Sequence, residues 1–238
     1  LLPHTKRLIA NLLGWKRADG SRLYRKAYWS MARKNTKTQS LALLGLCLLI
    51  LDQEAKPEVY IAATEVEQSG ECYEAAKDIV LSNPDLADYL TIVDYKKMIL
   101  CHANGGILKA LSSKGKGKHG SNPSAVIFDE LHAWGPEHQE LYDALTTGSG
   151  ARRQPLRVSI TTAGSDENSI CFEEYSYAKR VLSGQVEDPT YFADIYELPK
   201  DADWTDESLW SLANPAIDHF PGMRQMLREE RDAALNSP

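Results

Sequence analysis

In Ser124-Ala125-Val126-Ile127-Phe128-Asp129-Glu130-Leu131-His132-Ala133-Trp134, an apolar run ends in two adjacent carboxylates. Residues 125–128 are too few and too β-branched for a helix, so they predict a buried strand. Charges at the tip of a buried strand are costly unless they are used, and ligands bind at the carboxyl ends of strands in open α/β sheets. We therefore expect Asp129 to hold Mg²⁺ and Glu130 to position a water, as phosphoryl transfer requires. The alternative is that both acids only stabilise the N-terminus of a following helix.

A second segment, upstream of this strand, has the order expected of a phosphate-binding loop. Residues 24–32 predict a strand, residues 40–51 predict a buried helix, and the polar loop between them is Arg33-Lys34-Asn35-Thr36-Lys37-Thr38-Gln39. The usual pattern is G-x-x-x-x-G-K-[ST], and here Met31 and Thr36 occupy its two glycine positions. Taken alone, the loop is equally compatible with a basic surface turn. Its pairing with Asp129-Glu130 favours nucleotide hydrolysis.

Each side chain of this loop has a predicted role. The loop amides and the helix N-terminus would cradle phosphates, with Lys37 at the β/γ-phosphates and the Thr38 hydroxyl on Mg²⁺. Arg33 can stabilise transition-state charge as an arginine finger in cis; the alternatives are a surface arginine or a contact to DNA. Because a β-branched residue disfavours the torsions that glycine allows, we expect Thr36→Gly to tighten ATP binding.

Strands and helices alternate along the chain, which predicts an α/β fold with a mostly parallel central sheet flanked by helices. Thr161-Thr162-Ala163-Gly164 ends the strand that follows the carboxylates; it can couple the γ-phosphate to a moving part, or it can be an ordinary strand running into a glycine turn. His132 can report the nucleotide state or only cap a helix, and Trp134 is interpreted as a packing residue. The remaining strands are expected over 58–63, 90–95, 98–102, 107–111, 156–161 and 191–198, and the helices over 5–15, 65–81, 136–147, 168–182, 205–212 and 222–235.

Composition is that of an ordinary globular protein. A length of 238 residues suffices for one sizeable core. A formal net charge of −6 argues against nucleic-acid binding over the whole surface, although the basic run 114–119 can contact DNA or form a solvated turn. The four cysteines lack metal-type spacing and indicate a reducing compartment. The apolar run 41–51 is too short to span a bilayer.

Several runs follow one another in a recognisable order and spacing. They are 32–38, 60–64 with Gln68, His119-Gly120, Asp129-Glu130-Leu131-His132-Ala133-Trp134, Thr161-Thr162-Ala163-Gly164 and Ala213-Asn214-Pro215. In these runs the chain resembles the ATPase domain of tailed-phage large terminase subunits, which are DNA-packaging motors, and the resemblance covers nearly the whole chain. Pro3-His4-Thr5 stand near the place where the family tends to have a glutamine that recognises adenine.

The resemblance implies a RecA-like P-loop ATPase of the additional-strand (ASCE) type that uses ATP and Mg²⁺. It also implies double-stranded DNA, a portal and procapsid, a small terminase subunit and a homo-oligomeric ring as partners, in the host cell cytoplasm and without a membrane. We expect residues 1–198 to form the ATPase core. Residues 199–238 are expected to form a helical lid or linker toward a C-terminal nuclease domain that lies outside these 238 residues, so nuclease activity is not expected here.

Two alternatives from other classes stay open at this point. Asp129-Glu130-Leu131-His132 also has the form of the box found in one superfamily of helicases. A non-hydrolysing nucleotide-binding assembly module would follow if Thr36 has compromised the loop. Duplex unwinding distinguishes a helicase from a packaging motor, and steady-state ATP turnover distinguishes an enzyme from a module.

Overall fold

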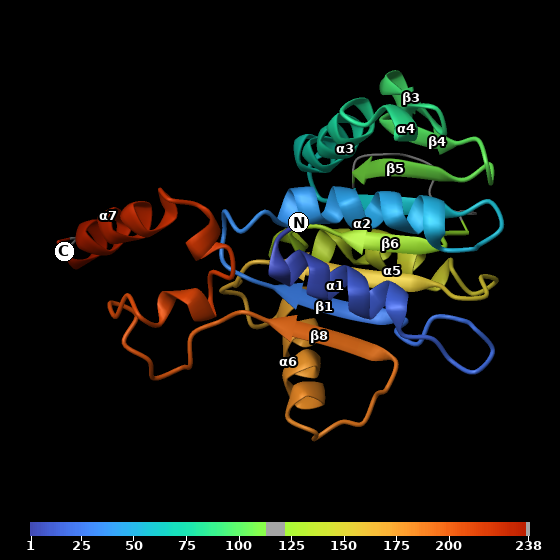
Figure 1. Cartoon of the computed structure of the whole chain (residues 1–238). Helices are drawn as coiled ribbons and strands as arrows, with labels where there is room; N and C mark the ends of the chain where they lie inside the picture. The colour runs from blue at the N-terminus through green and yellow to red at the C-terminus, as the bar shows by residue number, and fades with distance from the viewer. Residues whose placement is uncertain (113–121, 237–238) are drawn as a thin grey trace.

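The computed structural model describes residues 1–112 and 122–236, which form an eight-stranded sheet with helices on both faces (Figure 1). The strand order is β3-β4-β5-β2-β6-β7-β1-β8, and β4 runs antiparallel to both of its neighbours while the pairs from β5 to β8 are parallel. The strands are β1 (Lys26–Ser30), β2 (Glu58–Ala63), β3 (Leu90–Val93), β4 (Met98–Cys101), β5 (Ile107–Ser112), β6 (Ala125–Phe128), β7 (Leu156–Thr161) and β8 (Tyr191–Ile195).

The sheet confirms the predicted RecA-like architecture of the additional-strand type. Strand β7 lies between β1, which leads into the phosphate loop, and β6, which ends at the two carboxylates. In register, Ser30 lies opposite Thr161, and Phe128 lies opposite Ser159. Because parallel strands end at one edge, the loop, the carboxylates and the Thr161-Thr162-Ala163-Gly164 run all leave the sheet on the same side.

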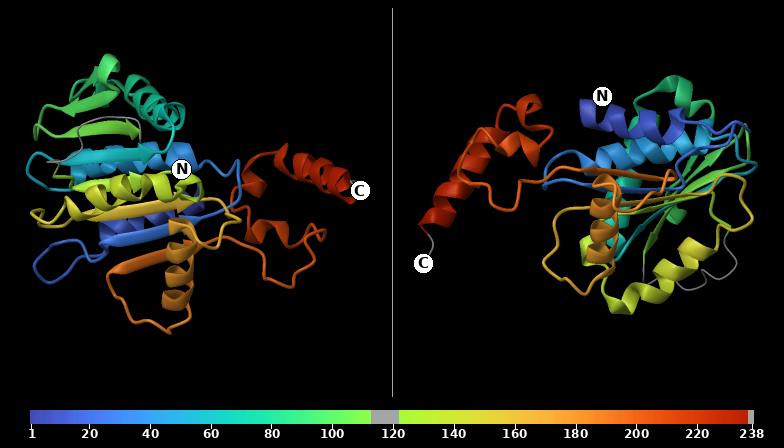
Figure 2. Two further views of the ribbon diagram at one scale, coloured as in Figure 1. Left: turned by 180° about the vertical axis from the view of Figure 1, so that it is seen from behind. Right: turned by 90° about the horizontal axis from the view of Figure 1, so that it is seen from below.

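Alternating side chains of the strands pack against two helical layers. Helices α1 (Pro3–Gly14), α2 (Lys37–Leu51) and α3 (Val66–Leu81) cover one face, and α5 (Gln139–Thr147) and α6 (Ile170–Leu182) cover the other (Figure 2). In β6, Ile127 belongs to the core under the first layer, whereas Phe128 belongs to the core under the second. The apolar strands are thus buried on both faces, as expected for a parallel sheet.

The C-terminal segment, residues 199–236, leaves β8 and lies beyond the carboxyl edge of the sheet (Figures 1 and 2). It contains the short 3₁₀ turns Trp210–Leu212 and Ile217–His219 and helix α7 (Met223–Leu235), and it has its own small apolar cluster of Trp210, Ile217 and Met223. Within the described residues, no helix combines the length and the apolar character that crossing a membrane requires.

Most of the predicted elements are confirmed to within a few residues, with two corrections. The helix expected over 205–212 is wrong, because only Trp210–Leu212 is helical. The Asp203 and Asp206 side chains accept hydrogen bonds from the backbone amides of Thr205 and Ser208 and so compete with helical pairing. The short helix α4 (Pro84–Ala87) was not expected from the sequence.

Candidate active site

The phosphate loop joins β1 to α2 and takes two left-handed residues, Lys34 at φ 65° and Thr36 at φ 61°. Thr36 occupies the N-cap position of α2, with ψ 28°, and its side chain makes no capping hydrogen bond within the described structure. The loop therefore adopts at Thr36 a conformation that normally favours glycine. Because no side chain caps α2, the amides of its first turn face outward, as an anion site requires.

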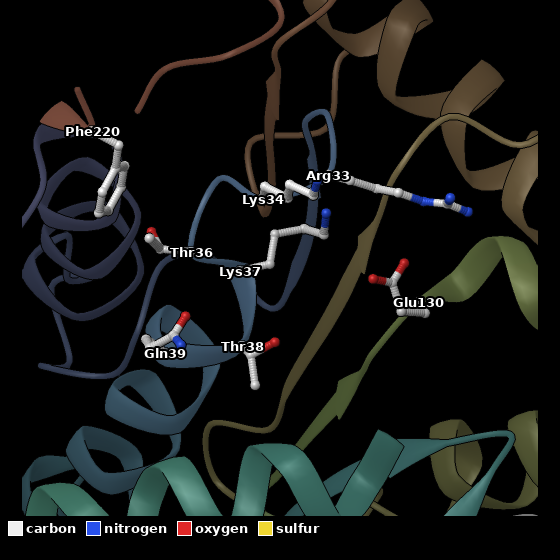
Figure 3. A pocket seen from close by; sticks show the side chains of 8 residues that line it. All are labelled: Arg33, Lys34, Thr36, Lys37, Thr38, Gln39, Glu130 and Phe220. Carbon is white, nitrogen blue, oxygen red and sulfur yellow. The ribbon is translucent and has the colours of Figure 1, made fainter. Parts of the chain in front are cut away.

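A pocket of about 360 Å³ opens over this loop (Figure 3). Figure 3 shows Arg33 and Lys37 extending toward the side on which Glu130 lies, while Phe220 stands beyond Thr36 on the other side of the loop. The pocket gathers all but two of the predicted loop and carboxylate residues, and its lining consists of Arg33, Lys34, Thr36, Lys37, Thr38, Gln39, Glu130 and Phe220.

Lys37 is held at the floor of this pocket. Its side chain is buried, and its Nζ donates to the carbonyl oxygen of Ala32 at 3.3 Å. Burial lowers the pKa of Lys37, and the nearby carboxylates of Glu130 and Asp129 act in the opposite direction. A triphosphate in the pocket would place negative charge beside this partly desolvated ammonium and so stabilise its protonated form.

Asp129 lies deeper than Glu130 and does not line the pocket. One of its carboxylate oxygens accepts from the Glu130 amide at 2.9 Å, and the other accepts from Cys72 Sγ on α3 at 3.2 Å. Burial raises the pKa of Asp129 to about 6. The carboxylate is thus fixed by two donors and costly to keep charged, which suits a group that a cation would neutralise.

Glu130 has the opposite electrostatic setting. Its backbone is left-handed, at φ 46°, and its side chain lines the pocket, whereas that of Asp129 does not. Burial raises the pKa of Glu130, but the contact with His132 and the charges of Lys37 and Arg33 outweigh it and hold this pKa below the ordinary value. Two adjacent carboxyls with pKa values shifted in opposite directions are suited to separate roles.

His132 connects Glu130 to the run at the end of β7. Its Nδ1 lies 3.1 Å from Glu130 Oε2 and 3.1 Å from Thr161 Oγ1, and its backbone amide donates to the same hydroxyl. Thr162 Oγ1 lies 3.3 Å from the same ring nitrogen. The structure therefore brings the run 161–164 next to the carboxylates through His132, for which a role in reporting the nucleotide state is one of the two predicted functions.

The donor set near the pocket suits Mg²⁺. A carboxylate and a hydroxyl, here Asp129 and Thr38, are hard oxygen ligands, and Mg²⁺ keeps several waters and needs few protein ligands. Within residues 1–112 and 122–236, no cluster of three or more His, Cys, Asp or Glu side chains has a metal-binding arrangement. The remaining ligands would accordingly come from water and the substrate phosphates.

Asn35 was predicted to bind the nucleotide, but its side chain is fully buried and turned away from the pocket. Its Nδ2 donates to Asn214 Oδ1 at 3.0 Å, and its Oδ1 accepts from the Ala216 amide at 3.0 Å. This contact fastens the loop to the C-terminal segment. In the sequence, only the run Ala213-Asn214-Pro215 indicated that Asn214 has a role at the site. Nothing in the sequence indicated such a role for Cys72 or Phe220.

The other predicted residues fall in different places. His4 lies buried beneath the loop, with its Nε2 3.2 Å from the carbonyl oxygen of Asn35. Trp134 is fully buried against Phe128, as predicted. Arg152 donates to the backbone carbonyls of Ala55 and Asn122. The basic run 114–119 and His119-Gly120 lie outside the described residues.

A family model and a curated relative identify the family of this chain. The family model described as "Terminase large subunit, ATPase domain" matches residues 3–180. The terminase large subunit of Enterobacteria phage HK97 is 30% identical over 211 residues, which cover 87% of this chain and 40% of that protein. Protein YmfN of Escherichia coli (strain K12) is 36% identical over 120 residues, 50% of this chain and 25% of that protein. The chain thus spans less than half the length of these relatives.

Solved structures give the same result. The crystal structure of the HK97 bacteriophage large terminase matches with a TM-score of 0.84 and 28% identity, covering 98% of this chain and 47% of that one. The N-terminal domain of the DNA packaging ATPase from bacteriophage phi29 matches with a TM-score of 0.51 at 16% identity, covering 76% of this chain and 93% of that one, which shows a shared fold.

Proposed function

We propose that this chain, which belongs to the family of terminase large-subunit ATPase domains, hydrolyses ATP to drive double-stranded DNA into a viral procapsid. The chain is an ATPase domain and binds nucleotide by virtue of that family. The geometry of its pocket supports hydrolysis: a buried lysine, a carboxylate and an arginine converge over an uncapped helix N-terminus.

In the proposed reaction, water attacks the γ-phosphate of ATP in line with the leaving oxygen. Lys37 and the amides at the start of α2 hold the phosphates, and Glu130 orients the water and accepts its proton. Arg33 stabilises charge that develops on the γ-phosphate. Thr38 and Asp129 would hold Mg²⁺, which neutralises phosphate charge when it is bound. His132 contacts both Glu130 and Thr161, so a movement of Glu130 would be transmitted through His132 to the run Thr161-Thr162-Ala163-Gly164 at the end of β7.

The partners follow from the family rather than from the pocket. We propose double-stranded DNA, a portal and procapsid, a small terminase subunit and a ring of identical subunits, working in the host cell cytoplasm. Residues 1–198 would be the ATPase core, and residues 199–238 the lid or linker. The helicase alternative loses its support, because the matching family model, which spans residues 3–180 and so includes the carboxylate run, is that of terminase large subunits.

The single observation that carries the proposal is the convergence of Lys37 and Glu130 on one pocket. Lys37→Ala should abolish ATP turnover and weaken ATP binding, whereas Lys6→Ala, an exposed lysine on α1, should leave both unchanged. Normal turnover by Lys37→Ala would remove the phosphate-loop assignment. DNA translocation is tested by comparing turnover with and without DNA and procapsid, and a lack of stimulation would contradict the packaging role.

A further inference from the structure

A second hollow lies directly beside the phosphate pocket. It has a volume of about 430 Å³ and shares Thr36, Gln39 and Phe220 with the first. Its other lining residues are the apolar Leu1, Leu2, Leu43 and Ile79 and the polar Thr5, Ser40 and His219. Ligand pockets are mostly apolar with a few polar groups. This hollow therefore suits the less polar part of a ligand whose charged part lies in the phosphate pocket.

The direction of the triphosphate decides which part of a nucleotide would reach this hollow. Glu130 acts on the water that attacks the γ-phosphate, so the γ-phosphate end must face Glu130. The α-phosphate end, which carries the ribose and base, then faces the opposite side of the loop. Figure 3 shows that Gln39, Thr36 and Phe220 stand on that side, and these are the residues that the two hollows share.

We propose that this hollow holds the nucleotide base, stacked on Phe220, so that the C-terminal segment forms one wall of the nucleotide site. The inference rests on the proposed ATPase function and deepens it by naming the base-binding element. Phe220 is 41% exposed, which leaves part of its ring free for contact. Stacking on an aromatic ring is available to any base, because every base has a π-face.

The position of Phe220 is fixed by the phosphate loop itself. The Asn35 side-chain amide bonds Asn214 and Ala216, and the Ala32 backbone amide donates to the Ala213 carbonyl at 3.1 Å. Asn35 is fully buried, and its Nδ2 also faces the carbonyl oxygens of Ala32 and Arg33. The segment that carries Phe220 is therefore attached to the same backbone that would bind phosphate.

Coupling between the two ends of the site follows from this attachment. If the base binds better when Phe220 is in place, then nucleotide binding must stabilise the docked segment by the same factor, because coupling between two binding events is reciprocal. Residues 199–236 extend beyond the carboxyl edge of the sheet (Figure 1), so their docking on the phosphate loop is the step that a bound base would bias.

The first experiment compares a ligand with a base to one without. Binding of Mg·ATP and of inorganic tripolyphosphate is measured by calorimetry on the whole chain and on Phe220→Ala. Loss of a stacking ring should weaken ATP binding by roughly tenfold and leave tripolyphosphate binding unchanged. Phe172→Ala is the matched control, because Phe172 has a similar exposure, 38%, and lines neither hollow.

The outcomes separate this inference from the proposed function. Unchanged ATP affinity in Phe220→Ala, with normal binding by the unaltered chain, would overturn the base site and leave the ATPase assignment intact. Equal weakening of ATP and tripolyphosphate would also overturn it, since Phe220 would then act on the phosphate loop. If the unaltered chain bound neither ligand, the proposed function itself would fail.

A second variant tests the attachment. Asn214→Ala removes the acceptor that Asn35 bonds, so it should lose about the same factor in ATP affinity as Phe220→Ala, and the double variant should lose little more. Amide hydrogen exchange over residues 199–236 should slow when ATP is added and should not slow with tripolyphosphate. Additive losses in the double variant, or equal protection by both ligands, would contradict the coupling.

Discussion

At the scale of single residues, Thr36 joins a β-branched side chain to a left-handed backbone, at φ 61° and ψ 28°. Residues forced into such conformations cost on the order of 1–3 kcal/mol. Its Oγ1 lies 3.4 Å from His4 Nε2, and its carbonyl oxygen accepts from the Ser40 amide and hydroxyl. These contacts hold the residue in place without nucleotide, so the strain is already present in the folded chain.

Thr36→Gly should therefore stabilise the chain. Relief of the left-handed strain gains about 1–3 kcal/mol, and the greater freedom of glycine in the unfolded chain takes back up to about 1 kcal/mol. We expect the free energy of unfolding to rise by roughly 0–3 kcal/mol, and ATP affinity to tighten less than tenfold. Urea denaturation and calorimetry measure the two quantities. Thr36→Ala, which keeps the Cβ, should recover less, and a less stable glycine variant would show that Thr36 fits the loop without penalty.

A side chain at position 164 would be crowded by His132. A Cβ at this position would lie 3.1 Å from His132 Cβ, and His132 is the contact between Glu130 and Thr161. Gly164→Ala should displace His132 by a few tenths of an ångström and lower kcat by about three- to tenfold, with ATP affinity unchanged. Gly150→Ala, where the nearest atom lies at 3.8 Å, is the control. Equal kcat in both variants would separate His132 from the reaction.

At the scale of elements, a buried ion pair joins the segment before β1 to the end of α2. Arg22 and Asp52 are paired with almost no exposure, and Gln154, just before β7, donates to Asp52 Oδ1 at 3.0 Å and accepts from the Arg22 amide at 2.9 Å. Three segments that are far apart in the sequence thus meet at the amino edge of the sheet, opposite the nucleotide pocket.

Arg22→Met should destabilise the chain by about 3–5 kcal/mol, because it leaves Asp52 as an uncompensated buried charge. The double variant Arg22→Met/Asp52→Leu removes both charges and should recover most of this loss. Urea denaturation gives the free energies of unfolding. ATP affinity in the folded fraction should stay the same, since the pair lies away from the pocket. A double variant as unstable as the single one would show that the loss does not come from the uncompensated charge of Asp52.

The elements also show how far the sequence could lead. Strand β6 and its carboxylates were predictable, because four buried apolar residues followed by two acids leave few alternatives. The turn over 203–209 was not, because Asp203 and Asp206 occupy backbone amides that the helical pattern would use. The contact between Asn35 and Asn214 was also beyond prediction: it joins residues 179 positions apart, and no local pattern specifies such a partner.

At the scale of the whole molecule, the residues of the candidate active site lie together at the carboxyl edge of the sheet. Arg33 supplies a cation from the same chain, whereas Arg152 is engaged at the other edge by backbone carbonyls. The acidic chain, with a formal net charge of −6, has no strong electrostatic reason to self-associate in solution. A ring would then depend on further contacts, such as those with a procapsid.

The chain alone should accordingly be mostly monomeric and a weak ATPase. If a neighbouring subunit completes the pocket, turnover per subunit must rise with protein concentration, because the active species is an assembly whose population follows mass action. Mixing the unaltered chain with Glu130→Gln, which should bind Mg·ATP and hydrolyse it about 10²–10⁴-fold more slowly, then lowers turnover more than simple dilution does. Turnover per subunit that stays constant on strong dilution, with no effect of the inactive variant, would mean that Lys37, Glu130 and Arg33 suffice within one chain.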